Sequence, residues 1–149
     1  MGLLTLPTSG LIYVDAQIAI YTVDVHPIYA PACRPIWNAV RAGTITAVSS
    51  ELMLLETLVA PLRNGDTVLA ANREALWQQA NTRLLPITPD ILREAARLRA
   101  TIPALKTPDA IHAATALLHD CNLFITNDVG FRRVPGLPLV ILDDVLAAP

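Results

Sequence analysis

Two aspartates directly follow apolar runs that have the composition of buried strands. Asp15 comes after Leu11–Val14, and Asp128 comes shortly after Leu123–Thr126. An unpaired carboxylate beside a buried strand is costly to desolvate, so each of these acids needs a cation or polar partners. Clustered carboxylates are the ligands that Mg²⁺ prefers in proteins. The two acids therefore indicate a metal site, although an ordinary turn residue after a strand is the alternative explanation for each.

A third candidate acid lies on a helix predicted to begin at Ser49 or Ser50 and to run toward Pro61. Glu51 and Glu56 are five residues apart on it, which turns their side chains about 140° away from each other. They cannot easily serve one site. The helix dipole accounts for a negative charge at Glu51 in the first turn. Glu56 lies in mid-helix on an apolar face, so we prefer it as the ligand; solvation at the edge of the core is the alternative.

Asp109 is the fourth candidate, and its local signal is the weakest. It lies in the first turn of a predicted helix, where the dipole alone favours an aspartate. His112 follows one turn later, and we interpret it as a packed or hydrogen-bonded histidine rather than a metal ligand. His26 and His119 have no partner at a meaningful spacing, so neither is assigned a role.

Other kinds of catalytic site lack their motifs in this chain. There is no GxSxG elbow, no GxxxxGK[ST] loop and no GxGxxG, which disfavours a serine hydrolase and nucleotide-cofactor chemistry. Cys33 and Cys121 have no ligand spacing and are predicted to be small buried hydrophobes. Met53, Trp37 and Trp77 are predicted to belong to the core or to an interface.

The elements that would position the acids alternate between strand and helix. This alternation predicts a parallel sheet between helical layers, with any site beyond the carboxyl ends of the strands. Threonine, proline and aspartate in succession predict matching helix starts at Thr88 and Thr107, and Asp66 can cap another helix. The predicted strands are Leu11–Val14, residues 44–48, residues 84–87, Leu123–Thr126 and residues 139–142; the predicted helices run from Ser49 or Ser50 toward Pro61, from Asp66 to about Arg83, from Thr88, and from Thr107 to about Asp120.

Length and composition predict one domain over residues 1–149, since the chain has 149 residues and is 53% hydrophobic. The first basic residue is Arg34, and Pro7 and Asp15 interrupt the apolar opening, so we expect a cytoplasmic protein without a membrane segment. The net charge of −2 includes the four candidate metal ligands. If four of the 13 acids bind metal, 13 − 4 = 9 remain against 11 basic residues. Ten of those are arginines, which suit phosphate contacts.

Taken together, these segments strongly resemble the PIN-domain family, and in particular the VapC-type toxins of toxin–antitoxin pairs. The resemblance covers nearly the whole chain. Its most specific part is a pair of segments, Pro108-Asp-Ala-Ile-His-Ala-Ala and Thr126-Asn-Asp, at this separation. It implies a three-layer α/β/α fold with a central parallel sheet and endonucleolytic cleavage of RNA.

Matched by motif, the resemblance makes Asp15, Glu56, Asp109 and Asp128 the catalytic acids, which would bind Mg²⁺ or Mn²⁺. It also makes Thr126 a supporting hydroxyl. Some relatives have a further acid after the Thr-Asn-Asp segment where this chain has Gly130 and Phe131, which leaves a second metal position open.

The expected partners are an RNA substrate, a cognate antitoxin and a second copy of the chain in a homodimer. Lys106, Arg132 and Arg133 are candidates to hold the RNA backbone. Two alternatives stay open: a metal-dependent nuclease or phosphatase acting on DNA or small phosphate esters, and a non-catalytic interaction module.

Overall fold

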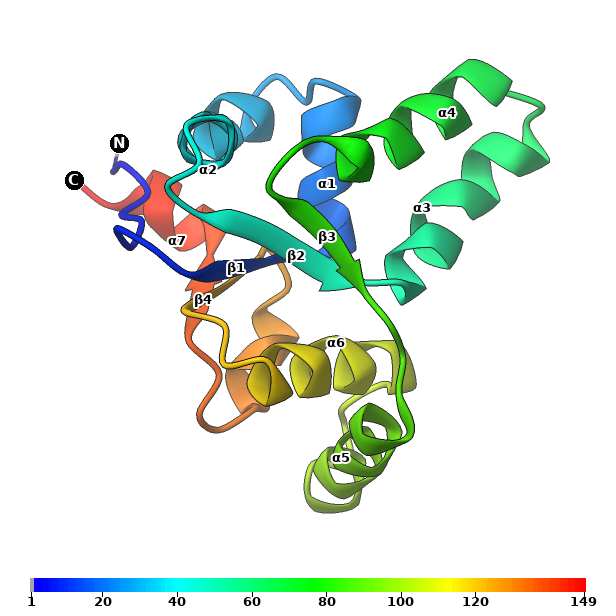
Figure 1. Cartoon of the computed structure of the whole chain (residues 1–149). Coiled ribbons are helices and arrows are strands. Elements are labelled where there is room, and N and C mark those ends of the chain that lie inside the picture. The colour runs from blue at the N-terminus through cyan, green and yellow to red at the C-terminus, as the bar shows by residue number, and fades with distance from the viewer. Residues whose placement is uncertain (1) are drawn as a thin grey trace.

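A parallel sheet of five strands forms the centre of the computed structural model, which describes residues 2–149 (Figure 1). The strand order is β3-β2-β1-β4-β5, and each neighbouring pair is parallel. Beginning from the edge of the sheet, β3 spans Thr82–Leu85, β2 Thr46–Ser50, β1 Leu11–Val14, β4 Leu123–Thr126 and β5 Leu139–Ile141. The predicted parallel sheet is confirmed.

Helices cover both faces of this sheet because successive residues of its buried strands face opposite ways. In β1, Ile12 and Val14 pack into one core and Tyr13 into the other. The first core is formed with α1 (Ala16–Val23), α2 (Tyr29–Arg41), the start of α3 (Leu52–Arg63) and the start of α7 (Leu142–Ala147); the second is formed with α5 (Pro89–Thr101) and α6 (Thr107–Leu118). The predicted three-layer α/β/α arrangement is therefore confirmed.

The predicted elements are largely present, with shifted ends. The helix beginning after Asp66 stops earlier than expected: α4 spans Thr67–Ala75, a 3₁₀ turn η1 covers Leu76–Gln78, and β3 begins at Thr82. Thr82 and Arg83, which were expected to end this helix, pair with β2 instead. No element was predicted for α1, α2 or α7. Pro35 lies inside α2, where proline normally argues against a helix.

Two of the predicted helix caps are confirmed. The Thr88 hydroxyl accepts from Ile91 N at 3.3 Å, and the Asp66 carboxylate accepts from Leu69 N at 3.0 Å. The cap predicted at Thr107 was wrong, because the helix already includes this residue. Its hydroxyl instead accepts a hydrogen bond from Arg99 at 2.8 Å.

Met53, Trp37 and Trp77 are buried, which confirms their predicted place in the core. None of the described helices is long and apolar enough to cross a membrane.

Both cysteines are buried and free, as predicted. Burial raises the pKa of the Cys33 and Cys121 thiols to about 12. The thiolate is the reactive form, so both should be almost inert toward Ellman's reagent at about pH 8 in the folded protein. Both should react promptly in guanidinium chloride. Rapid labelling of the native protein would contradict this placement.

Candidate active site

Asp15 lies where β1 ends and α1 begins, and its carboxylate is held by groups from α1 and β4. Ala16 N donates to Oδ1 at 2.8 Å, and the Thr126 hydroxyl donates to Oδ2 at 2.7 Å. The residue is 8% exposed. Burial raises the pKa of Asp15, although the charge of His112 and the Thr126 hydrogen bond act in the opposite direction. A buried carboxylate with a raised pKa is poised to accept a cation or a proton.

Asp128 is brought beside Asp15 by the pairing of β1 with β4. Val14 pairs with Ile125, so the next residues, Asp15 and Thr126, are neighbours at the carboxyl edge of the sheet. The Thr126 hydroxyl also accepts from Asp128 N at 3.0 Å, which connects the two acids through one side chain. The Asp128 carboxylate accepts from Gly130 N at 2.8 Å and is otherwise exposed. Thr126 thus contacts both acids, and its supporting role in a reaction stays a prediction.

Glu56 projects from α3 toward α6, where its carboxylate accepts a hydrogen bond from His112 Nε2. The other ring nitrogen of His112 is bonded to the Tyr13 hydroxyl, which in turn accepts from Ser50 N at 3.0 Å. His112 is 1% exposed, which confirms that it is a buried, hydrogen-bonded histidine. Glu51 is exposed. Glu56 therefore has a built support that Glu51 lacks.

The charges around His112 favour its imidazolium form. Burial alone would lower the pKa of this histidine, but the hydrogen bond to Glu56 and the negative charges of Asp15 and Asp109 outweigh burial, so the pKa is raised. In either protonation state Nε2–H donates to Glu56. The hydrogen bonds of Tyr13 and His112 thus fix the orientation of the Glu56 carboxylate.

Asp109 lies in the first turn of α6 and is half-buried. Its pKa is raised by burial and then by the carboxylates of Asp128, Asp15 and Glu56. The charges of these three carboxylates thus act on Asp109, although the four acids come from four separate elements. The fold brings all four predicted site residues to one edge of the sheet.

The four acids fit a hard cation by their chemistry, but they are not yet arranged around one. Among residues 2–149, no three His, Cys, Asp or Glu side chains lie close enough to hold a metal ion. Asp15, Glu56 and Asp128 each accept a hydrogen bond from the protein instead. A divalent cation would offset the repulsion between neighbouring carboxylates.

A buried ion pair supports the helix that carries Glu56. Arg73 of α4 donates to Asp24 Oδ2 at 2.8 Å and to the carbonyl oxygen of Thr57 at 2.7 Å. Because Thr57 follows Glu56 directly, this contact anchors α3 against the end of α1. The side chain of Arg73 is only 10% exposed.

The basic residues near the acids differ in availability. Arg132 forms an ion pair with Asp144, so its charge is already partly used. Lys106 and Arg133 are exposed and have no ion pair within the part of the chain that the structure describes. These two are therefore the better candidates for contact with a substrate phosphate.

Tyr13 was missed by the sequence analysis, whereas Asn127 was predicted as a supporting amide beside Asp128 without its partners being known. Tyr13 looked like one more apolar strand residue, although its position two residues before Asp15 is a usable signal. Asn127 Oδ1 accepts from Asp143 N at 2.9 Å, and its amide lies 3.4 Å from the Tyr21 hydroxyl. Both contacts join segments distant in the chain, and no local pattern encodes them.

Comparison with known proteins gives one family match and several similar folds. The family model of the PIN domain matches residues 12–137. VapBC2 from Rickettsia felis, solved bound to a promoter DNA fragment, aligns with a TM-score of 0.71 at 15% identity, covering 88% of this chain and 98% of that one. VapC20 from Mycobacterium tuberculosis, described as a toxin that cleaves the sarcin-ricin loop, has a TM-score of 0.67 at 16% identity over 81% and 92%. VapBC-5 of the same organism is 24% identical over 91% and 98%, with a TM-score of 0.56.

A curated protein of another name also matches. The 8-amino-7-oxononanoate synthase of Stenotrophomonas maltophilia (strain R551-3) is 29% identical, and the match covers 92% of this chain. It covers only 39% of the synthase. The chain thus spans well under half of that protein, and the activity in its name is not carried over.

Proposed function

Because the chain belongs to the PIN-domain family, we propose that it is a metal-dependent endoribonuclease acting as the toxin of a toxin–antitoxin pair. Its substrate would be RNA, and its reaction the hydrolysis of phosphodiester bonds. The solved proteins of similar fold support the toxin part of this proposal, since they are described as toxins or as toxin–antitoxin complexes.

The observation that carries the proposal is the way strand pairing gathers the acids: β1 pairs with β4, and the Thr126 hydroxyl donates to Asp15 and accepts from Asp128 N. Burial and the carboxylates of Asp128 and Asp15 raise the pKa of Asp109, and Asp15 is itself buried with a raised pKa. A fold does not gather uncompensated carboxylates without cost, so a site of this kind is a candidate for function. A bound cation would stabilise neighbouring carboxylates of this kind.

The donor set suits Mg²⁺ or Mn²⁺, since Asp15, Glu56, Asp109 and Asp128 offer hard oxygen ligands at an open edge of the sheet. Such an ion would acidify and orient a water for attack on the phosphodiester and would stabilise the developing negative charge.

The other residues of the site would serve by holding these ligands. Thr126 fixes Asp15 and the backbone of Asp128, and His112 fixes Glu56. Lys106 and Arg133 would contact the RNA backbone.

We also propose an antitoxin partner and a homodimer. The exposed face of α3 supports the dimer: Leu55, Val59 and Leu62 lie at helical spacing and are 63%, 41% and 63% exposed. An apolar stripe of this kind is costly to leave in water. A second copy of the chain would cover it.

A panel of substrates tests the proposed reaction. The protein should cleave a single-stranded RNA internally when Mg²⁺ or Mn²⁺ is present, and it should leave a DNA of the same sequence and p-nitrophenyl phosphate intact. EDTA should abolish cleavage, and an excess of Mg²⁺ should restore it. Equal cleavage of the DNA, hydrolysis of the ester alone, or full activity in EDTA would each contradict the proposal.

A further inference from the structure

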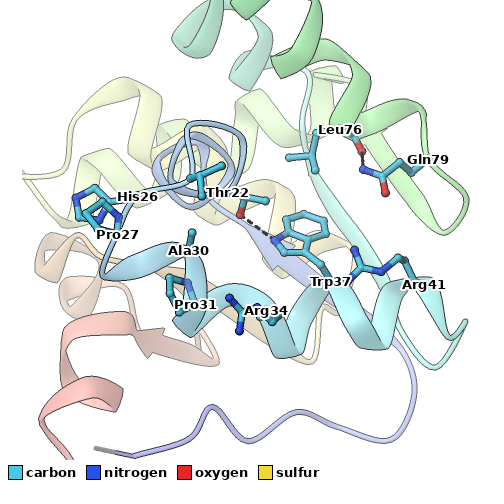
Figure 2. Close-up of a pocket in the computed structure, with 11 residues that line it drawn as sticks. Thr22, His26, Pro27, Ala30, Pro31, Arg34, Trp37, Arg41, Leu76 and Gln79 are labelled. Carbon is cyan, nitrogen blue, oxygen red and sulfur yellow. Dashed lines mark hydrogen bonds between the residues drawn. The ribbon is translucent and has the colours of Figure 1, made fainter.

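A cleft of about 400 Å³ lies between the end of α1, the exposed face of α2 and the turn η1 (Figure 2). None of the four site acids lines it, and its lining contains no aspartate or glutamate at all. The basic residues of the lining are His26, Arg34 and Arg41. The two arginines give this cleft a positive charge, although the chain as a whole has a net charge of −2.

The two arginines both project from α2 (Figure 2). They are seven residues apart, which is about two helical turns, so they share a face. Arg41 donates to the neighbouring Asn38 at 2.6 Å. Within residues 2–149, Arg34 forms no ion pair and no side-chain hydrogen bond, and it is exposed. Asp24 directly precedes Val25, which lines the cleft, but its carboxylate is already paired with Arg73. The cleft therefore offers guanidinium groups to an anion.

Trp37 lies between these arginines along α2 and forms an apolar wall of the cleft (Figure 2). Its Nε1–H donates to the Thr22 hydroxyl at 2.8 Å, which fixes the indole ring. Arginines beside aromatic side chains are typical of surfaces that bind single-stranded nucleic acid, where cations contact phosphates and exposed rings contact bases. Trp37 is only 6% exposed, so it shapes the wall of the cleft and does not offer a ring face.

Aromatic side chains connect the cleft to the acidic site. The ring centroid of His26, which lines the cleft, lies 5.1 Å from that of Tyr21 and 4.7 Å from that of Tyr29. All three rings are only partly buried. The Tyr21 hydroxyl lies 3.4 Å from the side-chain nitrogen of Asn127, the residue before Asp128. A strand leaving the acids can thus follow aromatic rings into the cleft.

We infer that this cleft binds the RNA strand on one side of the scissile bond, with Arg34 and Arg41 on its phosphates and His26 against its bases. The inference rests on the proposed ribonuclease function and adds to it a second contact region outside the acidic site. Arginine suits this role because its planar guanidinium can make two hydrogen bonds to one phosphate.

The test compares RNA binding by the wild type and by the double variant Arg34→Ala/Arg41→Ala. The probe is a fluorescein-labelled single-stranded RNA of about 16 nucleotides and mixed sequence, followed by anisotropy in EDTA. The double variant should bind roughly 10-fold more weakly at low salt, and the slope of log K against log salt should fall by about 1.4, as expected for two lost phosphate contacts on a single strand. The matched control is Arg93→Ala/Arg97→Ala on α5, which removes the same charge from the opposite face of the sheet. It should bind like the wild type.

Cleavage kinetics separate this inference from the proposed function. With Mg²⁺, the double variant should raise KM for the same RNA and leave kcat unchanged. Equal affinity and equal KM in the wild type and both double variants would overturn the cleft assignment while leaving the nuclease intact. Weaker binding by the Arg34→Ala/Arg41→Ala protein, together with no RNA cleavage by the wild type, would support the cleft and reject the ribonuclease instead. Unchanged RNA affinity combined with lost binding of a polyglutamate peptide would also overturn it, since the cleft would then accept an acidic protein segment.

Discussion

Asp15→Asn should lower kcat for RNA cleavage by about 100- to 1000-fold, which corresponds to roughly 3–4 kcal/mol of lost transition-state stabilisation. Asparagine has nearly the same shape but only one acceptor oxygen and no charge. It would weaken the cation site and reverse the Thr126 contact, since the oxygen can still accept from Ala16 N while the amide nitrogen would donate to the Thr126 hydroxyl. The measurement is single-turnover cleavage of a labelled RNA with saturating Mg²⁺.

Stability provides the internal check on Asp15→Asn. The pKa of Asp15 is raised in the folded protein, so the unfolded chain releases this proton at lower pH. Without metal, the contribution of Asp15 to the free energy of unfolding is therefore full below the unfolded-state pKa and is lost as pH rises through the folded-state value. Asp15→Asn removes that pH dependence and should not destabilise the apo protein at neutral pH.

The control for this variant is Asp120→Asn, the same change at an exposed site. Asp120 lies just before β4, at the amino ends of the strands, whereas Asp15 lies at their carboxyl ends. Asn tolerates the left-handed backbone that Asp120 adopts at φ 50°. Asp120→Asn should cleave like the wild type. If Asp15→Asn cleaves RNA as fast as Asp120→Asn, Asp15 does not take part in the reaction.

Tyr13→Phe should lower activity by about 10- to 100-fold, the range typical when a residue supporting a metal ligand is lost. The change removes only the hydroxyl, which bonds to His112 and accepts from Ser50 N. His112 would then hold Glu56 less firmly. The free energy of unfolding should also fall, by about 1–3 kcal/mol, because Ser50 N and a ring nitrogen of His112 are left buried without partners.

A second buried hydroxyl separates positioning from general loss of stability. Thr115 lies on α6, the helix of His112, and its hydroxyl donates to the carbonyl oxygen of Ile111 at 2.6 Å. Thr115→Val should destabilise the protein and leave kcat and the Mg²⁺ dependence unchanged. Tyr13→Phe should lower kcat and should also raise the Mg²⁺ concentration needed for half-maximal activity. Equal activity of these two variants would show that the Tyr13 network has only a structural role.

The layers of the fold could be predicted because they depend on local patterns. Short apolar runs such as Leu11–Val14 need cover on both faces, and the helices between them can supply it. Element ends were less predictable. The helix from Asp66 stops before β3 because strand pairing with β2 competes for the same residues. Helix α2 was missed since its internal Pro35 argues against a helix locally, while burial of Ile36, Trp37 and Val40 favours it.

The sequence by itself determined which acids were candidates: Asp15 and Glu56 because a carboxylate after a buried strand or in an apolar helix face needs compensation, and Asp109 and Asp128 mainly through the resemblance to the PIN-domain family. It also determined the parallel sheet that brings strand ends together. The tertiary structure alone decided how the acids are supported. Asp15 meets Thr126 through strand pairing, and Glu56 meets His112 and Tyr13 through helix packing. These partners are 111, 56 and 99 residues apart in the chain, so only packing of the whole fold could place them together.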